Sequence, residues 1–214
     1  MKILSRRDTI YAIATGLTAG ILGHITLASL DASIAGIPSS WLIVVIPILW
    51  LLGVQLGYFL GRWIGFFDSF GKYAAIGFTN FAVYSAILRL ESYLSGITEG
   101  GGVALLTSVA FALATLHGYF WNKYWSFDAR TSQNSKREFI LYWVVSLISL
   151  GVNSGTAYGV VNFVTIPGVI TPEQWLSLGG IIGSAAALIF SFVGFKLIVF
   201  KNHALPTVSA KNIQ

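Results

Sequence analysis

The chain contains no cysteine among its 214 residues, and it carries few charges for its length. The missing cysteines exclude disulfides, thiolate metal sites, iron–sulfur clusters and cysteine nucleophiles. Lysine and arginine together number 13 and aspartate and glutamate 8, which is a tenth of the chain, whereas soluble domains carry about 25% charged residues. So few charges cannot cover a globule of this length with solvated surface, and a water-soluble enzyme is therefore excluded.

The chain contains six long runs without a charged residue, and 55% of all its residues are apolar. The runs are residues 9–30, 32–61, 73–88, 100–122, 139–172 and 174–195. About 20 helical residues cross a hydrocarbon core of about 30 Å, so we predict an all-α integral membrane protein with six transmembrane helices. Only 16 residues separate Lys72 from Arg89, so either both side chains snorkel to the interface or the third helix continues past Arg89 towards Tyr93.

The basic residues are distributed unequally between the predicted loops and termini. Of the 13 lysines and arginines, 12 flank the helices on one face, and the other face keeps only Arg89. Since positively charged loops remain in the cytoplasm, we predict a multi-pass protein of the cell membrane with both termini cytoplasmic. The net charge of +5 follows from this topology, and no nucleic-acid partner is expected.

Small residues recur at four-residue spacing in several predicted helices, a pattern that lets helices approach closely in lipid. Such sets are Gly53, Gly57, Gly61 and Gly65; Ala110, Ala114 and Gly118; Gly151, Gly155 and Gly159; and Gly179, Gly183 and Ala187. Packing inside the bundle is the favoured interpretation. A homodimer through Gly53, Gly57 and Gly61 is the alternative, and the sequence does not separate the two.

Two short signatures recur at a constant offset of 73 residues. The matched pairs are Asn80 with Asn153, Lys123 with Lys196, and Phe127 with Phe200. They fall at corresponding places in two successive helical hairpins, each of which begins and ends on the basic face. The last four helices are therefore predicted to form two tandem hairpins in the same orientation, an arrangement that occurs among transporters.

The segment Phe70-Gly71-Lys72-Tyr73 precedes Gly77 and Asn80, and the next span closes on Asn122-Lys123-Tyr124-Trp125-Ser126-Phe127. With the final segment 195–200, these residues resemble the GtrA family of small four-helix membrane proteins. The resemblance covers about residues 66–201, and the Asn-Lys-x-Trp-x-Phe run is its most specific part.

This resemblance implies a division of the chain and a function. The expected parts are an N-terminal two-helix extension (1–65), a GtrA-like four-helix domain (66–201) and a cytoplasmic tail (202–214). The implied role is cell-surface polysaccharide or glycolipid assembly, with translocation of a polyprenyl-phosphate-linked sugar and a partner glycosyltransferase. The first two helices lie outside the usual module, and Phe195 stands where the first copy has Asn122.

A lipid-linked sugar phosphate presents an anion at the headgroup level and a sugar that must cross hydrocarbon. Lysines hold such a phosphate through charge-assisted hydrogen bonds, and amides inside the spans replace water around the sugar. The candidate ligand-binding residues are Lys72, Asn80, Asn122, Lys123, Trp125, Asn153 and Lys196. Anchoring at the membrane interface is the competing explanation for the lysines, and bonding to a neighbouring helix is the competing one for the amides.

The predicted spans contain no aspartate or glutamate, whereas proton-driven pumps carry buried carboxylates. We therefore expect downhill flipping, and we expect no catalytic residue, metal ion or cofactor. Two functions remain open. One is a flippase for polyprenyl-phosphate-linked sugars; the other is a scaffold that binds a glycosyltransferase through the basic loop of residues 128–137.

Overall fold

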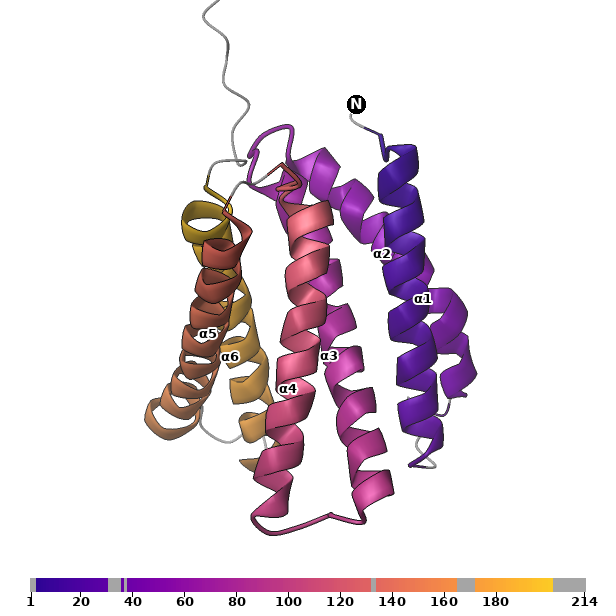
Figure 1. Cartoon of the computed structure of the whole chain (residues 1–214), viewed down its shortest axis with the longest axis vertical. Coiled ribbons are helices and arrows are strands. Elements are labelled where there is room, and N and C mark those ends of the chain that lie inside the picture. The colour runs from indigo at the N-terminus through magenta and orange to yellow at the C-terminus, as the bar shows by residue number, and fades with distance from the viewer. Residues whose placement is uncertain (1–2, 31–35, 37, 132–133, 165–171, 202–214) are drawn as a thin grey trace, which may run out of the picture. The chain divides into compact units, whose positions relative to one another are not determined.

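The computed structural model describes residues 3–30, 36, 38–131, 134–164 and 172–201. The elements in those ranges are helices: α1 (Arg6–Ala28), η1 (Ser39–Trp41), α2 (Leu42–Leu60), α3 (Phe67–Ser95), α4 (Gly102–Trp121), α5 (Ser135–Phe163) and α6 (Pro172–Gly194). Two π-helices, η2 (Asn122–Ser126) and η3 (Phe195–Val199), directly follow α4 and α6. The predicted all-α membrane architecture with six long helices is confirmed (Figure 1).

The third helix is longer than its uncharged run. It extends over 29 residues and ends where Gly96 takes a left-handed φ of 70°. Arg89 therefore lies inside α3, and its guanidinium donates to the hydroxyl and the carbonyl oxygen of Ser29, each at 3.1 Å. Of the two alternatives, continuation past Arg89 is the one observed, because this arginine has partners at the end of α1.

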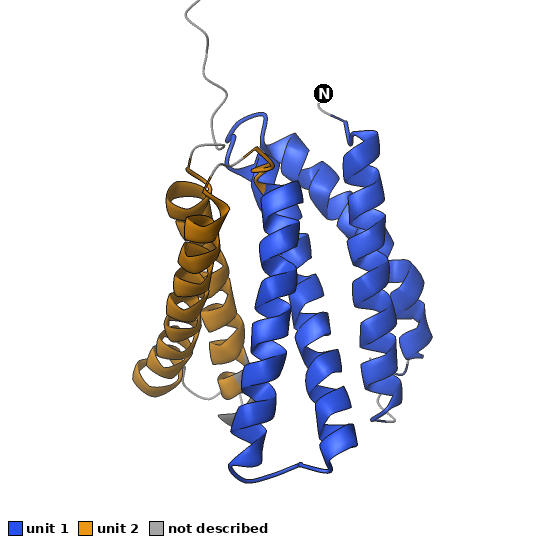
Figure 2. Cartoon of the chain, in the orientation of Figure 1, with its two compact units in different colours: residues 1–126 blue, residues 127–214 orange. Residues whose placement is uncertain are grey.

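The chain divides into two compact units, residues 1–126 and 127–214 (Figure 2). The first unit holds α1 to α4 and η2, and the second holds α5, α6 and η3. The boundary predicted at residue 65 concerns family resemblance and stays a prediction; in the structure α1 and α2 both pack against α3. The predicted tail, residues 202–214, lies outside the described residues.

Glycines in the first unit let the backbones of neighbouring helices touch. A Cβ atom built on Gly16 would lie 2.5 Å from the Cα of Pro47, so α1 and α2 meet at this point. A Cβ on Gly71 would lie 2.9 Å from the carbonyl oxygen of Gly53, and one on Gly57 would lie 2.9 Å from that of Phe67. The small residues thus bring α1 to α2 and α2 to α3, as close approach in lipid requires.

The structure bears on the three glycines predicted for a homodimer. Gly57 and Gly61 face α3, where they contact Gly71 and Asp68, whereas a Cβ on Gly53 would meet nothing within 4 Å. Packing inside the chain therefore accounts for Gly57 and Gly61. The homodimer itself stays a prediction.

The second unit is a hairpin in which α6 supplies the small residues. A Cβ on Gly183 would lie 2.5 Å from the carbonyl oxygen of Asn153, and one on Gly179 would meet Val161. In contrast, Gly151 and Gly155 of α5 have open space at the Cβ position. In the first hairpin the second helix, α4, also has small buried residues, Ala110 and Ala114. Small residues on the second helix are thus buried in both hairpins.

Candidate functional site: a buried charge cluster and two repeated lysines

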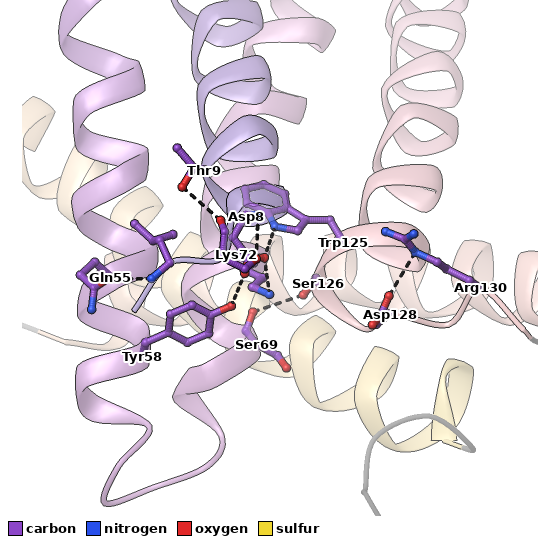
Figure 3. A network of polar contacts seen from close by, with 12 residues as sticks. Asp8, Thr9, Gln55, Tyr58, Ser69, Lys72, Trp125, Ser126, Asp128 and Arg130 are labelled. Carbon is purple, nitrogen blue, oxygen red and sulfur yellow. Dashed lines mark hydrogen bonds and ion pairs between the residues drawn. The ribbon is translucent and has the colours of Figure 1, made fainter. Parts of the chain in front are cut away.

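The carboxylate of Asp8 is the centre of a polar cluster at one end of the first unit (Figure 3). Ser5 caps α1: its hydroxyl accepts from the backbone N–H of Asp8 at 3.1 Å and donates to Oδ2 at 2.5 Å. The Tyr58 hydroxyl donates to the same oxygen at 2.7 Å. The other oxygen, Oδ1, lies 2.7 Å from Lys72 Nζ and accepts from Trp125 Nε1 at 3.1 Å. Both carboxylate oxygens are therefore satisfied.

Asp8 and Lys72 form a buried ion pair, with exposed fractions of 3% and 8%. A buried pair is retained at low cost only where its geometry is good and further hydrogen bonds satisfy both charges. Tyr58 and Trp125 supply those bonds to the carboxylate, and the Lys72 ammonium also lies 5.2 Å from the centre of the Tyr58 ring. The cluster therefore ties α1, α2, α3 and η2 together.

Aromatic side chains pack beside the pair, one turn further along α1. The Tyr11 ring meets Trp121 and Trp125 edge-on, with centroid distances of 5.5 and 6.0 Å. Trp125 is fully buried. Rings placed in this way exclude water and lower the local dielectric constant, so the attraction between Asp8 and Lys72 is stronger than at a wet surface.

Asp8 stands just before an uncharged run and was not among the predicted site residues. The expectation that the spans contain no carboxylate stays a prediction. The uncharged run starts at Thr9, but α1 starts at Arg6, so the carboxylate falls in the first helical turn. A local signal was present in the sequence: Ser5 stands three residues before Asp8, the spacing at which a serine caps a helix. The ion-pair partner of Asp8 could not be predicted from the local sequence, because Lys72 lies 64 residues later in another helix.

The two predicted hairpins end in the same unusual local structure. The π-helices η2 (Asn122–Ser126) and η3 (Phe195–Val199) occupy positions exactly one repeat length apart. Lys123 Nζ lies 5.6 Å from the ring centre of Tyr119, and Lys196 Nζ lies 5.5 Å from that of Phe192, the equivalent ring. The repeat therefore holds in local backbone geometry and in the placement of the lysine over a ring, as well as in sequence.

The two lysines differ in exposure. Lys123 is 3% exposed, and its ammonium also donates to the Tyr119 hydroxyl at 3.3 Å. Lys196 is half-buried, and its equivalent ring, Phe192, carries no hydroxyl. Phe195, which replaces the amide of the first copy, stacks on Tyr142 at a centroid distance of 4.1 Å. The second π-helix therefore packs on aromatic rings, of which the one beside its lysine has no hydroxyl, and Lys196 is more exposed than Lys123.

The repeated asparagines both join the two helices of their own hairpin. Asn80 Oδ1 lies 2.6 Å from His117 Nδ1, which links α3 to α4. Asn153 Nδ2 donates to the Ser184 hydroxyl at 3.2 Å, which links α5 to α6. Bonding to a neighbouring helix thus occurs at both predicted amides, and each pair also places polar groups within the apolar part of its hairpin.

Comparison with known proteins identifies the region that contains these features. The family model described as GtrA/DPMS, transmembrane domain, matches residues 72–200. The chain belongs to this family. No curated protein and no solved structure matches the chain. Membership makes it a multi-pass membrane protein of a family associated with glycolipid and polysaccharide synthesis.

All of the predicted ligand-binding residues lie inside the GtrA/DPMS region, which begins at Lys72 itself. The structure brings Lys72 and Trp125 together on Asp8, and Asn122 beside Lys123 in η2, where the Asn122 amide donates to the carbonyl oxygen of Gly118 at 2.9 Å. Asp8 and Tyr58 come from the N-terminal helices, outside the matched region. Ligand binding by the predicted residues stays a prediction.

Within the described ranges, no group of three or more histidine, aspartate or glutamate side chains is placed to hold a metal ion. The lysines offer anion binding, and the amides, hydroxyls and imidazole offer hydrogen bonds.

Proposed function

We propose that this GtrA/DPMS protein flips polyprenyl-phosphate-linked sugars across the membrane for the synthesis of a cell-surface polysaccharide or glycolipid. Family membership supports the general role, and the helices long and apolar enough to span a bilayer support the setting. The observation that carries the proposal is the repeated lysine in a π-helix at the end of each hairpin. A lysine at the end of a spanning helix lies at the level of the lipid headgroups, where the phosphate is. Its ammonium group can bind that phosphate through charge-assisted hydrogen bonds.

Among the three candidate lysines, Lys196 is the best placed to meet a lipid phosphate first. Lys72 is engaged with Asp8, and Lys123 is almost fully buried beside Tyr119. Lys196 is half-buried, so its ammonium reaches an incoming anion with less rearrangement. We expect Lys72 and Lys123 to act chiefly by holding the first hairpin in shape.

The polar pairs within the hairpins support the second requirement, passage of the sugar. Asn80 with His117, and Asn153 with Ser184, offer donors and acceptors along helices that are otherwise apolar. Such groups exchange their own hydrogen bonds for bonds to sugar hydroxyls, which lowers the cost of taking the sugar out of water. Movement is expected to be downhill, driven by consumption of the lipid at the far face.

Replacing Lys196 by methionine is expected to slow flipping at least tenfold, because methionine keeps the side-chain length and removes the cation. Purified protein in liposomes, with a fluorescent polyprenyl-phosphate-linked sugar, gives the rate of transbilayer movement. Lys201→Met is the matched control, since Lys201 is exposed just beyond η3 and should keep the wild-type rate. Equal rates for both variants would contradict the role of Lys196, and no movement with the wild type would contradict the function.

The second candidate function is a scaffold for a glycosyltransferase, and the exposure of basic residues around the start of α5 favours it. Arg130, Lys136 and Arg137 are all exposed, and Arg130 forms an ion pair with Asp128, its neighbour in sequence, at 3.1 Å. Changing the three basic residues to alanine is expected to abolish co-purification of the enzyme if this function holds. The readout is sugar transfer by membranes with and without the variant; normal transfer and unchanged co-purification would count against the scaffold.

A further inference from the structure

A groove runs between α2 and α3 in the first unit, outside the charge cluster and the lysine sites. Its volume is about 310 Å³, and the side chains around it are apolar and aromatic, with Trp50, Phe67, Phe70 and Phe78 among them. Its floor is formed by glycines, since Gly53, Gly57 and Gly71 lie where the two backbones touch. An apolar channel with a backbone floor suits a slender hydrocarbon chain.

The groove has the length of one membrane leaflet. On α2 it extends from Leu49 to Leu60 and on α3 from Phe67 to Phe78, which at 1.5 Å per residue is about 16 Å, roughly half of a 30 Å hydrocarbon core. Trp63 stands three residues after Leu60, between the two helices that form the groove, and its side chain is 67% exposed, as expected of a tryptophan at the membrane interface. A groove of this length that begins at headgroup level would end near the middle of the bilayer.

We propose that this groove binds the isoprenoid tail of the lipid-linked sugar, an inference that rests on the proposed function. Arg62 stands two residues after Leu60, the last groove residue of α2; its exposed guanidinium lies 5.8 Å from the centre of the Trp63 ring and complements a phosphate. Asp68 follows Phe67 in α3, and its carboxylate packs against Gly61. A polyprenyl phosphate whose first isoprene units lie in the groove would thus place its phosphate near the Arg62 guanidinium.

A single chain fits the groove better than a helix from a second copy does. Trp50 and Phe78 close the inner end with ring centroids 6.0 Å apart, and Phe67 and Phe70 stand together at the outer end at 6.1 Å. Packing between helices of two copies needs a long seam of small residues on both. Here large rings interrupt the seam at each end, so the open stretch around Gly53 is short and enclosed.

Replacing Gly53 by leucine fills the groove with little disturbance of the fold, because a Cβ on Gly53 meets nothing within 4 Å. The matched control is Gly155→Leu on α5, where a Cβ also meets nothing within 4 Å. Both changes add the same apolar volume and the same helix preference. A difference between them therefore reports on the groove.

The full chain in lipid nanodiscs is irradiated with a long polyprenyl phosphate that carries a diazirine in its second isoprene unit. We expect cross-links in residues 49–60 and 67–78, a loss of at least fivefold in Gly53→Leu, and wild-type labelling in Gly155→Leu. Cross-links elsewhere, or equal labelling of Gly53→Leu, would overturn the proposal. Equal labelling of the same residues by a diazirine phospholipid would assign the groove to bulk lipid and overturn the proposal. A shift from dimer to monomer in Gly53→Leu would assign the groove to a second copy and would also overturn it.

Flipping assays separate this inference from the function on which it rests. If the wild type flips the lipid-linked sugar and Gly53→Leu does so equally with no cross-links in the groove, the tail site fails and the function stands. If the wild type moves no lipid but its groove is labelled selectively by the polyprenyl probe, the tail site stands and the flippase function fails. With both correct, Gly53→Leu slows flipping of the polyprenyl substrate at least fivefold, and Gly155→Leu flips it at the wild-type rate.

Discussion

Replacing Asp8 by alanine is expected to lower the free energy of unfolding by about 3–5 kcal/mol, because a buried lysine loses its counterion. Lys72 is only 8% exposed and lies 2.7 Å from the carboxylate. The same change leaves the Tyr58 hydroxyl and the Trp125 indole without their acceptor. Denaturation of the purified protein in mixed detergent micelles, followed by tryptophan fluorescence, gives the free energy.

Asp128→Asn is the control for Asp8→Ala, because it removes the charge and keeps a side chain that tolerates the left-handed φ of 49° at this position. Asp128 also pairs with a basic residue, Arg130, at 3.1 Å, but both side chains are about half exposed, and exposed pairs contribute about 0–1 kcal/mol. In the double variant Asp8→Ala with Lys72→Met, most of the lost stability should return, because no buried charge is left without a partner. Equal losses for Asp8→Ala and Asp128→Asn would contradict the buried-pair account.

The Asp8 pair joins the N-terminal helices to the region that the family model matches. Lys72 is the first residue matched by the GtrA/DPMS model, whereas Asp8 and Tyr58 come from helices outside it. The extension therefore supplies the counterion for a lysine of the domain. It also supplies α2, one wall of the groove proposed to hold the isoprenoid tail.

The sequence predicted the helices well because their signal is local. A run of about 20 apolar residues has to become a helix in lipid, where every backbone group needs an internal partner. The exception was α3, which extends six residues before the uncharged run of residues 73–88 and seven residues after it. Arg89 is tolerated there because Ser29 of another helix accepts its hydrogen bonds, and such a contact has no signature in the sequence.

The candidate site was predicted in part. Lys123 and Lys196 were found through their constant offset, and the structure places both in equivalent π-helices. Their different burial was not predictable, because it depends on Tyr119 and Phe192 and on the packing around each hairpin end. Asp8 was missed for a related reason: its burial comes from side chains 50 and 117 residues away in sequence.

Replacing Gly183 by leucine is expected to destabilise the second hairpin by about 2–3 kcal/mol, because extra volume has to be forced into a close-packed contact. A Cβ on Gly183 would lie 2.5 Å from the carbonyl oxygen of Asn153 and 3.2 Å from the backbone nitrogen of Ala157. Both atoms belong to the α5 backbone, which cannot rotate aside as a flexible side chain can. The helices must therefore separate, which also breaks the hydrogen bond from Asn153 to Ser184.

Gly180→Leu, one helical turn earlier on α6, separates this packing effect from the loss of a glycine. A Cβ on Gly180 meets nothing within 4 Å, so leucine there keeps the α5–α6 contact and favours the helix. We expect detergent denaturation to show wild-type or slightly higher stability for Gly180→Leu and a clear loss for Gly183→Leu. Because α6 leads directly into η3 and Lys196, flipping should fall with Gly183→Leu alone. Equal stability of the two variants would mean that α5 and α6 do not touch at Gly183.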